Sequence, residues 1–327
     1  MEDTERQVKE ALLKLPLLKS EIAKVIVGQE QAINQLLVAF LAGGHALLEG
    51  VPGLAKTLLV KTLSEATFLD FRRIQFTPDL MPSDIIGTEV LEEDHASGKR
   101  FFKFNKGPLF SNIVLADEIN RTPPKTQAAL LEAMQEYAVS YAGNTYPLPK
   151  PFFILATQNP IEQGGTYPLP EAQLDRFLLL IKMGYPEEAH EIQILTQTTG
   201  EKRPPVASVL KGEEIQALQD ACRKVFIGEQ LVSWVARMVR ATRPDTSSLA
   251  VVKEQVRWGA GPRAGQALIV CAKAHALLEG RFAVSEADIK AVAPAVLRHR
   301  VLLSFRAEAE GFTTDKLVQE LIQSISI

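Results

Sequence analysis

Short apolar runs alternate with helical patterns along the first 185 residues, and this alternation is the strongest constraint on the fold. The runs are mostly continuous in apolar character, which is typical of strands covered on both faces. The predicted strands are His45–Glu49, Phe71–Phe76, Asn112–Ala116, Phe152–Thr157 and Phe177–Met183. The predicted helices between them are Gln29–Ala42, Lys56–Ala66 and Pro123–Glu136, the last with Thr122 as N-cap and Pro123 as first helical residue. Together they indicate a five-stranded parallel sheet in a layered α/β domain.

The pattern changes after Gly184, where strands are expected to stop. The helical patterns that follow are Glu187–Thr199, Glu213–Val225, Glu229–Thr242, Arg263–Glu279 and Ser285–Arg298. Ser285 and Asp288 have capping-box spacing. A chain of 327 residues also exceeds the roughly 250–300 residues at which one core usually stops growing. We therefore expect an α/β domain over residues 1–185 and a smaller all-helical domain over residues 186–327.

Charge and cysteine content exclude several classes of protein. The net charge of −3 and pI of about 6.0 argue against a strongly basic domain for bulk nucleic-acid binding. No apolar run approaches the ~20 residues that span a bilayer, and the acidic N-terminus lacks a signal-peptide pattern. Only Cys222 and Cys271 are present, which excludes a disulfide scaffold and a cysteine-based zinc site. These features fit a reducing cytoplasm.

Residues 77–110 interrupt the alternation with a connection that is long for a compact domain. Such a connection is usually functional or disordered, and an ordinary surface excursion is the alternative. A charged turn at Glu92–His95 precedes the run Lys99–Phe104, which we interpret as one arm of a hairpin. The three phenylalanines of this arm, Phe101, Phe102 and Phe104, allow two readings: they brace the insert on the core, or they contact a partner polypeptide.

A glycine-containing segment follows the first predicted strand and opens a helix, which is the context of a phosphate-binding loop. Its residues are Gly50, Val51, Pro52, Gly53, Leu54, Ala55, Lys56 and Thr57. Its backbone N–H groups would surround a β-phosphate, Lys56 would reach the β- and γ-phosphates, and the Thr57 hydroxyl would ligate Mg²⁺. Ala55 replaces the glycine expected before the lysine, and its methyl group is tolerated if φ is negative. The loop alone indicates nucleotide binding rather than hydrolysis.

Two carboxylates, Asp117 and Glu118, end another predicted strand. Open α/β sheets bind ligands at the carboxyl ends of their strands. Asp117 is therefore predicted to hold Mg²⁺ through water, and Glu118 to polarise the attacking water as a general base. An apolar strand ending in Asp-Glu is common in isolation, so the assignment depends on the phosphate loop.

Three further residues are candidates for a role in hydrolysis, each with an ordinary alternative. Asn159 follows the strand Phe152–Thr157 and either orients water at a γ-phosphate or occupies a turn before proline. Arg176 precedes the last strand and is either catalytic or a surface arginine paired with a nearby acid. Arg263 begins a helix of the second domain and reaches the γ-phosphate if that domain folds over the nucleotide. Otherwise it is a solvated arginine at a helix end.

The order and spacing of these motifs resemble those of the MoxR family of AAA+ ATPases across roughly residues 20–300. The segments that carry the resemblance are Val27–Glu30, Gly50–Thr57 with its Gly-Leu-Ala-Lys-Thr ending, Leu115–Arg121, Ala156–Pro160, Glu171–Phe177 and Pro262–Ala264. Ala55 is itself typical of this family.

The resemblance implies a role for each matching residue. It assigns Walker A to Lys56 and Thr57, Walker B to Asp117 and Glu118, and the segment that lines the adenine to Val27, Gly28 and Gln29. Asn159 resembles sensor 1 and Arg263 sensor 2. Arg176 resembles the arginine finger, which acts on ATP bound to the neighbouring subunit.

The resemblance also implies an architecture and a function. Residues 77–110 resemble the helix-2 insert, and Tyr137–Leu148 the hairpin before sensor 1. Family members form hexameric rings and act as chaperone-like machines on protein clients, often with a von Willebrand factor A-domain partner. The expected protein is a bacterial, cytoplasmic enzyme that hydrolyses ATP with Mg²⁺ to remodel, mature or assemble protein complexes.

Other readings stay open. The protein is alternatively a nucleotide-gated assembly module with little intrinsic turnover, or another helix-2-insert machine such as a magnesium-chelatase-type or DNA-acting ATPase. The Gly-Leu-Ala-Lys-Thr ending disfavours the chelatase, and the acidic pI and absence of a DNA-binding module disfavour the DNA motor. The basic residues of the insert leave a weak nucleic-acid alternative, against a solvated basic arm; they are Lys99, Arg100, Lys103 and Lys106.

Overall fold

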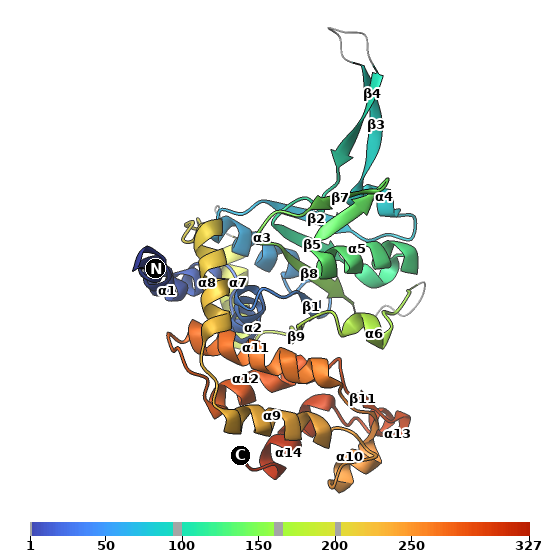
Figure 1. Ribbon diagram of the computed structural model, residues 1–327. Helices are drawn as coiled ribbons and strands as arrows, with labels where there is room; N and C mark the ends of the chain where they lie inside the picture. Colours follow the sequence, from blue (N-terminus) through green and yellow to red (C-terminus); the bar gives the residue numbers. More distant parts are fainter. Residues whose placement is uncertain (1, 94–99, 160–165, 200–203) are drawn as a thin grey trace.

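The computed structural model describes residues 2–93, 100–159, 166–199 and 204–327. Its centre is a five-stranded parallel sheet in the order β2-β5-β8-β1-β9 (Figure 1). The strands are β1 (Ala46–Glu49), β2 (Phe71–Gln75), β5 (Ile113–Asp117), β8 (Phe153–Gln158) and β9 (Leu179–Lys182). All five predicted strands are present, and the predicted α/β architecture is confirmed.

Helices cover both faces of this sheet, and alternate strand residues enter two apolar cores. The helices are α2 (Glu30–Leu41) and α3 (Lys56–Ala66) on one face, with α1 (Glu2–Ala23) packed against them, and α5 (Pro124–Glu136) on the other face. In β5, Leu115 joins the first core and Val114 the second. The predicted start of α5 is wrong by one residue: Pro123 is the N-cap, and the Thr122 hydroxyl instead donates to the Thr77 carbonyl at 2.8 Å.

The elements that the structure describes in the second half of the chain are helices, apart from one short strand pair. Its helices are α7 (Glu188–Thr198), α8 (Gly212–Lys224), α9 (Glu229–Ala241), α10 (Ala250–Gln255), α11 (Pro262–Leu278), α12 (Glu286–Leu297), α13 (Phe305–Ala309) and α14 (Thr314–Ser324). The expectation that strands stop after Gly184 is wrong in one place, because β10 (Val256–Trp258) pairs antiparallel with β11 (Leu302–Leu303). In the part of the chain that the structure describes, no helix is both long and apolar enough to cross a bilayer.

The predicted capping box begins α12 and is part of a larger buried network. The fully buried Asp288 carboxylate accepts hydrogen bonds from the Ser285 N–H at 2.7 Å and from Arg281 Nη1 at 2.8 Å. His275 Nδ1, on α11, lies 2.7 Å from the same carboxylate. Asp288 therefore ties the end of α11 to the start of α12.

The insert is a hairpin that projects from the body of the molecule (Figure 1). After α4 (Pro82–Ile86), β3 (Gly87–Glu93) pairs antiparallel with β4 (Arg100–Lys106). Gly87 and Gly107 allow the two strands to meet at the base: Gly87 has a φ of +108°, and a Cβ on Gly107 would lie 2.5 Å from the Ile85 carbonyl oxygen. The predicted arm is confirmed for Arg100 onward, whereas Lys99 and the turn residues from Asp94 lie outside the described residues.

The phenylalanines of the hairpin divide into one bracing residue and two exposed residues. The Phe104 ring stacks on Tyr146 with ring centroids 4.3 Å apart, so it braces β4 against the hairpin of β6 (Ala138–Tyr141) and β7 (Asn144–Pro147). Phe101 and Phe102 are 45% and 70% exposed. The reading in which the phenylalanines brace the insert is therefore confirmed for Phe104 and wrong for Phe101 and Phe102, whose side chains are exposed.

A buried histidine, His45, lies immediately before β1 at the edge of the sheet. Its Nδ1 accepts a hydrogen bond from the Ile154 N–H at 3.0 Å, and its Nε2 lies 3.1 Å from the Met134 carbonyl oxygen. Burial lowers the pKa of His45 to about 4. The neutral ring, donating from Nε2, therefore links β1, β8 and α5.

We expect the protein to lose stability as the pH falls from about 6.5 to 4. The pKa of His45 is lower in the folded protein than its value of ~6.5 in the unfolded chain, so the unfolded chain binds more protons in this pH window. This proton binding lowers the free energy of unfolding by up to about 3 kcal/mol. His45→Gln keeps an acceptor and a donor without titrating, and should lose less stability. Burial also holds the pKa of His299 well below its ordinary value, a contribution that both proteins share. Thermal unfolding at pH 7 and pH 4 measures the difference, and an equal loss in both proteins would contradict the assignment.

Candidate functional site

The glycine-containing loop joins β1 to α3, as the sequence predicts. Gly53 has a φ of +89° and Ala55 a φ of +58°. The condition for easy tolerance of the Ala55 methyl group, a negative φ, is therefore not met: its backbone is left-handed, a conformation that costs a residue with a Cβ about 1–2 kcal/mol. The loop therefore holds a local strain that a glycine would relieve.

Lys56, the first residue of α3, points back across the loop. Its Nζ donates to the Gly50 carbonyl oxygen at 2.6 Å. Burial lowers the pKa of Lys56, while the Asp117 and Glu118 carboxylates act in the opposite direction. The lysine and the two predicted catalytic carboxylates are therefore within electrostatic reach of one another.

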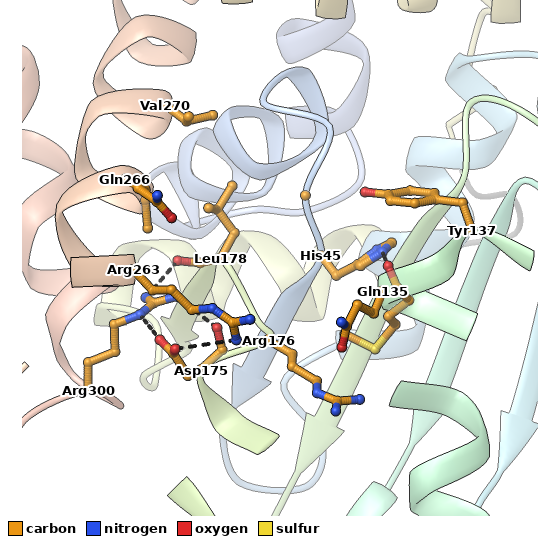
Figure 2. A pocket seen from close by; sticks show the side chains of 13 residues that line it. His45, Gln135, Tyr137, Asp175, Arg176, Leu178, Arg263, Gln266, Val270 and Arg300 are labelled. Atoms are coloured by element: carbon orange, nitrogen blue, oxygen red, sulfur yellow. Dashed lines mark hydrogen bonds and ion pairs between the residues drawn. The ribbon is translucent and has the colours of Figure 1, made fainter. Parts of the chain in front are cut away.

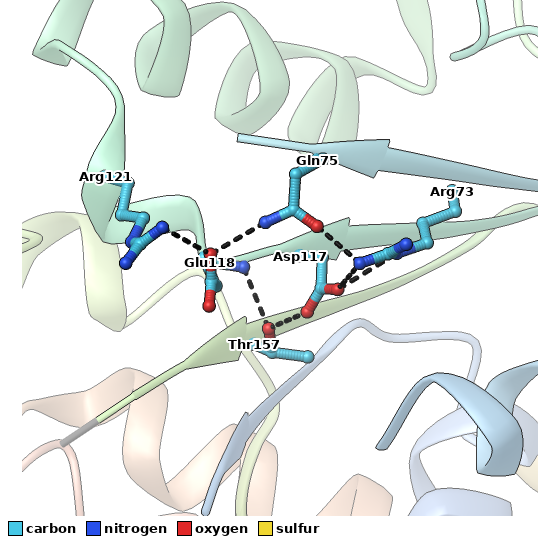
Figure 3. Close-up of polar contacts among 6 residues, drawn as sticks. All are labelled: Arg73, Gln75, Asp117, Glu118, Arg121 and Thr157. Carbon is cyan, nitrogen blue, oxygen red and sulfur yellow. Dashed lines mark hydrogen bonds and ion pairs between the residues drawn. The ribbon is translucent and has the colours of Figure 1, made fainter. Parts of the chain in front are cut away.

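Asp117 ends β5, and both of its carboxylate oxygens are engaged (Figure 3). The Thr157 hydroxyl donates to Oδ1 at 2.6 Å. Arg73, on the edge strand β2, donates to Oδ2 from Nε at 3.0 Å and from Nη2 at 2.7 Å. Asp117 is almost fully buried, and the Arg73 guanidinium compensates its charge from the solvent side.

Glu118 follows in a left-handed conformation with a φ of +58°, which turns its side chain out of the strand direction. Its N–H donates to the Thr157 hydroxyl at 2.9 Å, so Thr157 touches both carboxylate residues. Gln75 Nε2 donates to Glu118 Oε2 at 2.7 Å, and Arg121 Nη1 lies 3.2 Å from the same oxygen. Because Gln75 also accepts from Arg73 Nη2 at 2.5 Å, a continuous polar chain joins Asp117 to Glu118.

Sequence reasoning missed three members of this chain: Arg73, Gln75 and Thr157. Arg73 and Gln75 are two residues apart on β2 and therefore share one face of the strand. Two polar residues at that spacing in a predicted strand were the available signal. The register pairs Gln75 with Asp117, which brings this face against the end of β5.

Asn159 lies one residue beyond β8, between the two motifs. In the sheet, β8 pairs with β1 on one side and β5 on the other, and Gln158 lies opposite Glu49. Asn159 is therefore level with Gly50, where the glycine-containing loop begins, and its side chain is almost buried. The structure brings the loop, the two carboxylates and Asn159 together at the carboxyl ends of three adjacent strands.

Val27, Gly28 and Gln29 meet the segment that follows β9. Gln29 Nε2 donates to the Gly184 carbonyl oxygen at 2.9 Å. Gly28 has a φ of +70°, and a Cβ there would lie 2.8 Å from Cβ of His190 on α7. Since Gly50 also lies against Met183, the three segments converge beside the loop.

Arg176 and Arg263 lie at the opposite edge of the sheet, around a pocket of about 320 Å³ (Figure 2). Both arginines border Asp175, which precedes the start of β9. The glycine-containing loop follows the end of β1. Because β1 and β9 run parallel, the arginines and the loop lie at opposite ends of the strands. Asp175 accepts from the buried Arg300 Nε at 2.7 Å, and Arg263 Nη1 lies 3.7 Å from its second oxygen. The condition under which Arg263 would reach its own chain's nucleotide is not met in this structure, because the start of α11 packs beside Asp175 instead.

Comparisons with known proteins identify the family. Residues 45–179 match the ATPase family associated with various cellular activities (AAA), and residues 249–321 match the AAA lid domain. Chaperone MoxR1 of Mycobacterium tuberculosis is 44% identical over 308 residues, covering 94% of this chain and 80% of that protein. The chain belongs to the MoxR family of AAA+ ATPases.

Other similar proteins agree in sequence and in structure. YeaC of Bacillus subtilis is 42% identical over 94% of this chain and 92% of its own, and MoxR of Methylorubrum extorquens is 32% identical over 86% of each. The crystal structure of a candidate ATPase from Cytophaga hutchinsonii superposes with a TM-score of 0.90 at 42% identity, covering 100% of this chain and 98% of that one. The resemblance read from the sequence is confirmed.

The polar groups at the ends of β1 and β5 suit the magnesium nucleotide that a MoxR-family ATPase would bind. Magnesium favours hard oxygen ligands and keeps several water molecules, so one or two protein groups suffice. The Thr57 hydroxyl, on the first turn of α3, and the Asp117 carboxylate are groups of this kind. The α3 N-terminus adds free N–H groups for phosphate oxygens.

Proposed function

We propose that this protein binds ATP with Mg²⁺ at residues 50–57 and hydrolyses it. Lys56 would hold the β- and γ-phosphates, while Thr57 and Asp117 would hold the metal, which neutralises phosphate charge when bound. Glu118 would accept a proton from the attacking water, and Asn159 would orient that water. Val27–Gln29, beside Gly184 and His190, would line the adenine.

One observation carries this proposal: the Lys56 ammonium group, the Asp117 and Glu118 carboxylates, and Asn159 converge at one edge of the sheet. These groups would supply different parts of phosphoryl transfer: charge neutralisation, proton acceptance and the orientation of water. Phosphate release by the purified protein, with and without Mg²⁺, tests it directly. Release that is absent, or independent of Mg²⁺, would contradict it.

Arg176 and Arg263 would act on ATP held by a neighbouring subunit. Both lie at the sheet edge opposite the phosphate loop of their own chain, so they cannot complete that site without a large rearrangement. The Arg176 side chain forms no ion pair with the residues that the structure describes. Head-to-tail contacts between copies would bring both arginines to each nucleotide and close a ring, which we propose to be a hexamer.

ATP turnover would drive the remodelling or assembly of protein complexes. We place the division between an AAA+ core and a lid at about residue 185, between the regions that match the AAA and lid families. The name of the M. tuberculosis relative, a chaperone, supports protein clients. The projecting β3–β4 hairpin is the proposed client contact, and a von Willebrand factor A-domain protein is the proposed partner.

The exposed aromatic residues of the hairpin give a direct test of client contact. Phe101→Ala plus Phe102→Ala should change the free energy of unfolding by less than about 0.5 kcal/mol each, because both side chains are already exposed. Basal ATP turnover should persist, and client-stimulated turnover should disappear. Phe104→Ala is the matched control, since it removes the Tyr146 stack and should lower thermal stability. A large melting shift in the double variant would contradict a client role.

A nucleotide-gated assembly module is the second candidate, and the contacts of Glu118 favour it. Gln75 and Arg121 hold this carboxylate, so turnover would be slow until they release it. Affinity capture with a Glu118→Gln variant, trapped with ATP, would recover clients and partners. Comparing basal with partner-stimulated phosphate release then distinguishes an ATPase that remodels complexes from a nucleotide-gated assembly module.

A further inference from the structure

Helix α7 carries an exposed stripe that nothing in the described structure covers. No residue of α7 is buried, and Ile192 and Leu195 are each 58% exposed. Glu188 and Glu191 precede them at the spacing that places all four residues on one helix face. We call Glu188, Glu191, Ile192 and Leu195 the α7 stripe. It combines an acidic start with an apolar end.

A second exposed surface lies at the far end of the lid, around β10 and α13. Trp258 is 69% exposed and Phe305 is 86% exposed. Lys253 and Arg257 flank them, are exposed, and form no ion pair with the residues that the structure describes. We call Lys253, Arg257, Trp258 and Phe305 the Trp258 surface. It offers aromatic area beside unpaired positive charge, which complements the α7 stripe.

The two surfaces belong to opposite edges of the molecule. The α7 stripe adjoins the edge with the proposed nucleotide site, at the carboxyl ends of the strands. There His190 of α7 packs on Gly28, and the Gly184 carbonyl oxygen accepts a hydrogen bond from Gln29. The Trp258 surface adjoins the opposite edge, where Arg176 and Arg263 border Asp175, and which we call the arginine edge. The chain runs from β10 to Arg263 in a few residues, and Arg263 lies beside Asp175. Figure 1 shows α7 beside α8 and α13 on the far side, near α10. Two copies placed head to tail would therefore bring these surfaces together.

We propose that the α7 stripe of one protomer docks on the Trp258 surface of the next copy. This inference rests on the proposed action of Arg176 and Arg263 across a subunit boundary. It names an apolar contact that would position these two arginines at the neighbouring subunit. Ile192 and Leu195 pack on Trp258, while Glu188 and Glu191 face Lys253 and Arg257. Because the contact uses two different surfaces, it repeats around a ring and leaves neither surface free. The partner is a second copy of this chain.

Cysteine crosslinking tests the contact in the assembled protein. Both native cysteines are buried, and burial raises the pKa of Cys222 to about 11, so background oxidation is slow. Leu195→Cys and Trp258→Cys are made in separate chains and mixed with ATP under mild oxidation. Mixtures should form a disulfide-linked heterodimer about tenfold faster than mixtures with a control, because docking raises the effective thiol concentration. The control replaces Trp258→Cys with Phe282→Cys, which is 53% exposed beyond the other end of α11.

Charge reversal gives an independent measurement. Glu188→Lys plus Glu191→Lys should raise the dissociation constant for assembly by about tenfold or more at low salt, because like charges then meet across the contact. Lys253→Glu plus Arg257→Glu should do the same. Mixing the two variants should restore assembly at the interfaces where the reversed charges meet. Sedimentation velocity measures each case.

The outcomes separate this inference from the proposed function. Rings that form and hydrolyse ATP without the Leu195–Trp258 crosslink, and without sensitivity to charge reversal, overturn the docking and leave the ATPase proposal standing. Equal crosslinking with Phe282→Cys also overturns it. A protein that neither assembles nor hydrolyses ATP overturns both.

Discussion

Glu118→Gln should retain ATP binding and lose about 10²–10⁴-fold in turnover, the usual contribution of a general base. The glutamine side chain has nearly the same shape and keeps an oxygen that can accept from Gln75 Nε2. It cannot take a proton from water, so the phosphate site should form normally and the chemical step should fail. Equilibrium nucleotide binding and phosphate release, measured on the same preparation, separate these effects.

Lys56→Ala is the matched control for that experiment. It removes the ammonium group that bridges to the Gly50 carbonyl and would hold the phosphates, so ATP binding itself should be lost or greatly weakened. A Glu118→Gln protein that loses binding as severely as Lys56→Ala would assign Glu118 a structural role. Its contacts with Gln75 and Arg121 would then serve the fold rather than the reaction.

The sheet and the glycine-containing loop between β1 and α3 were predictable because their signals are local. Strands covered on both faces must be continuously apolar, and Gly50 to Thr57 lies directly between such a strand and a helix. The left-handed backbone at Ala55 was not predictable, because the loop geometry imposes it against the preference of the residue. Local sequence identified the loop but not the strain within it.

The polar chain around Asp117 and Glu118 could not be predicted without knowing the register of the sheet. Arg73 and Gln75 precede these carboxylates by more than forty residues and meet them only because β2 pairs with β5. The hairpin phenylalanines show the same limit. Phe104 differs from Phe101 and Phe102 because rings of other segments, Phe110, Tyr141 and Tyr146, lie within reach of its ring. Long-range pairing decided which of these side chains are held and which are free to bind.

The position of Arg263 depended on how the lid packs against the core, which no local pattern reveals. Arg300, almost fully buried, donates to the Phe177 carbonyl oxygen at 2.7 Å and to Asp175, and this fixes the end of the lid beside the start of β9. Arg263 is therefore carried to the arginine edge together with Arg176. Two positive side chains at one edge suit a phosphate chain presented by another subunit better than either residue alone.

Arg176→Ala should bind ATP almost normally and hydrolyse it about 10³–10⁵-fold more slowly, the usual contribution of an arginine finger to turnover. The guanidinium would neutralise charge that develops on the transferring phosphoryl group, and its own chain offers no phosphate loop within reach. Mixing Arg176→Ala protein with Lys56→Ala protein should restore activity, because some interfaces then combine an intact loop with an intact arginine. Subunit exchange, followed with labelled protein, must be shown in the same mixture. If exchange occurs and activity stays absent, Arg176 does not act across the boundary, and the edge that it shares with Arg263 is not the one that meets the neighbouring nucleotide.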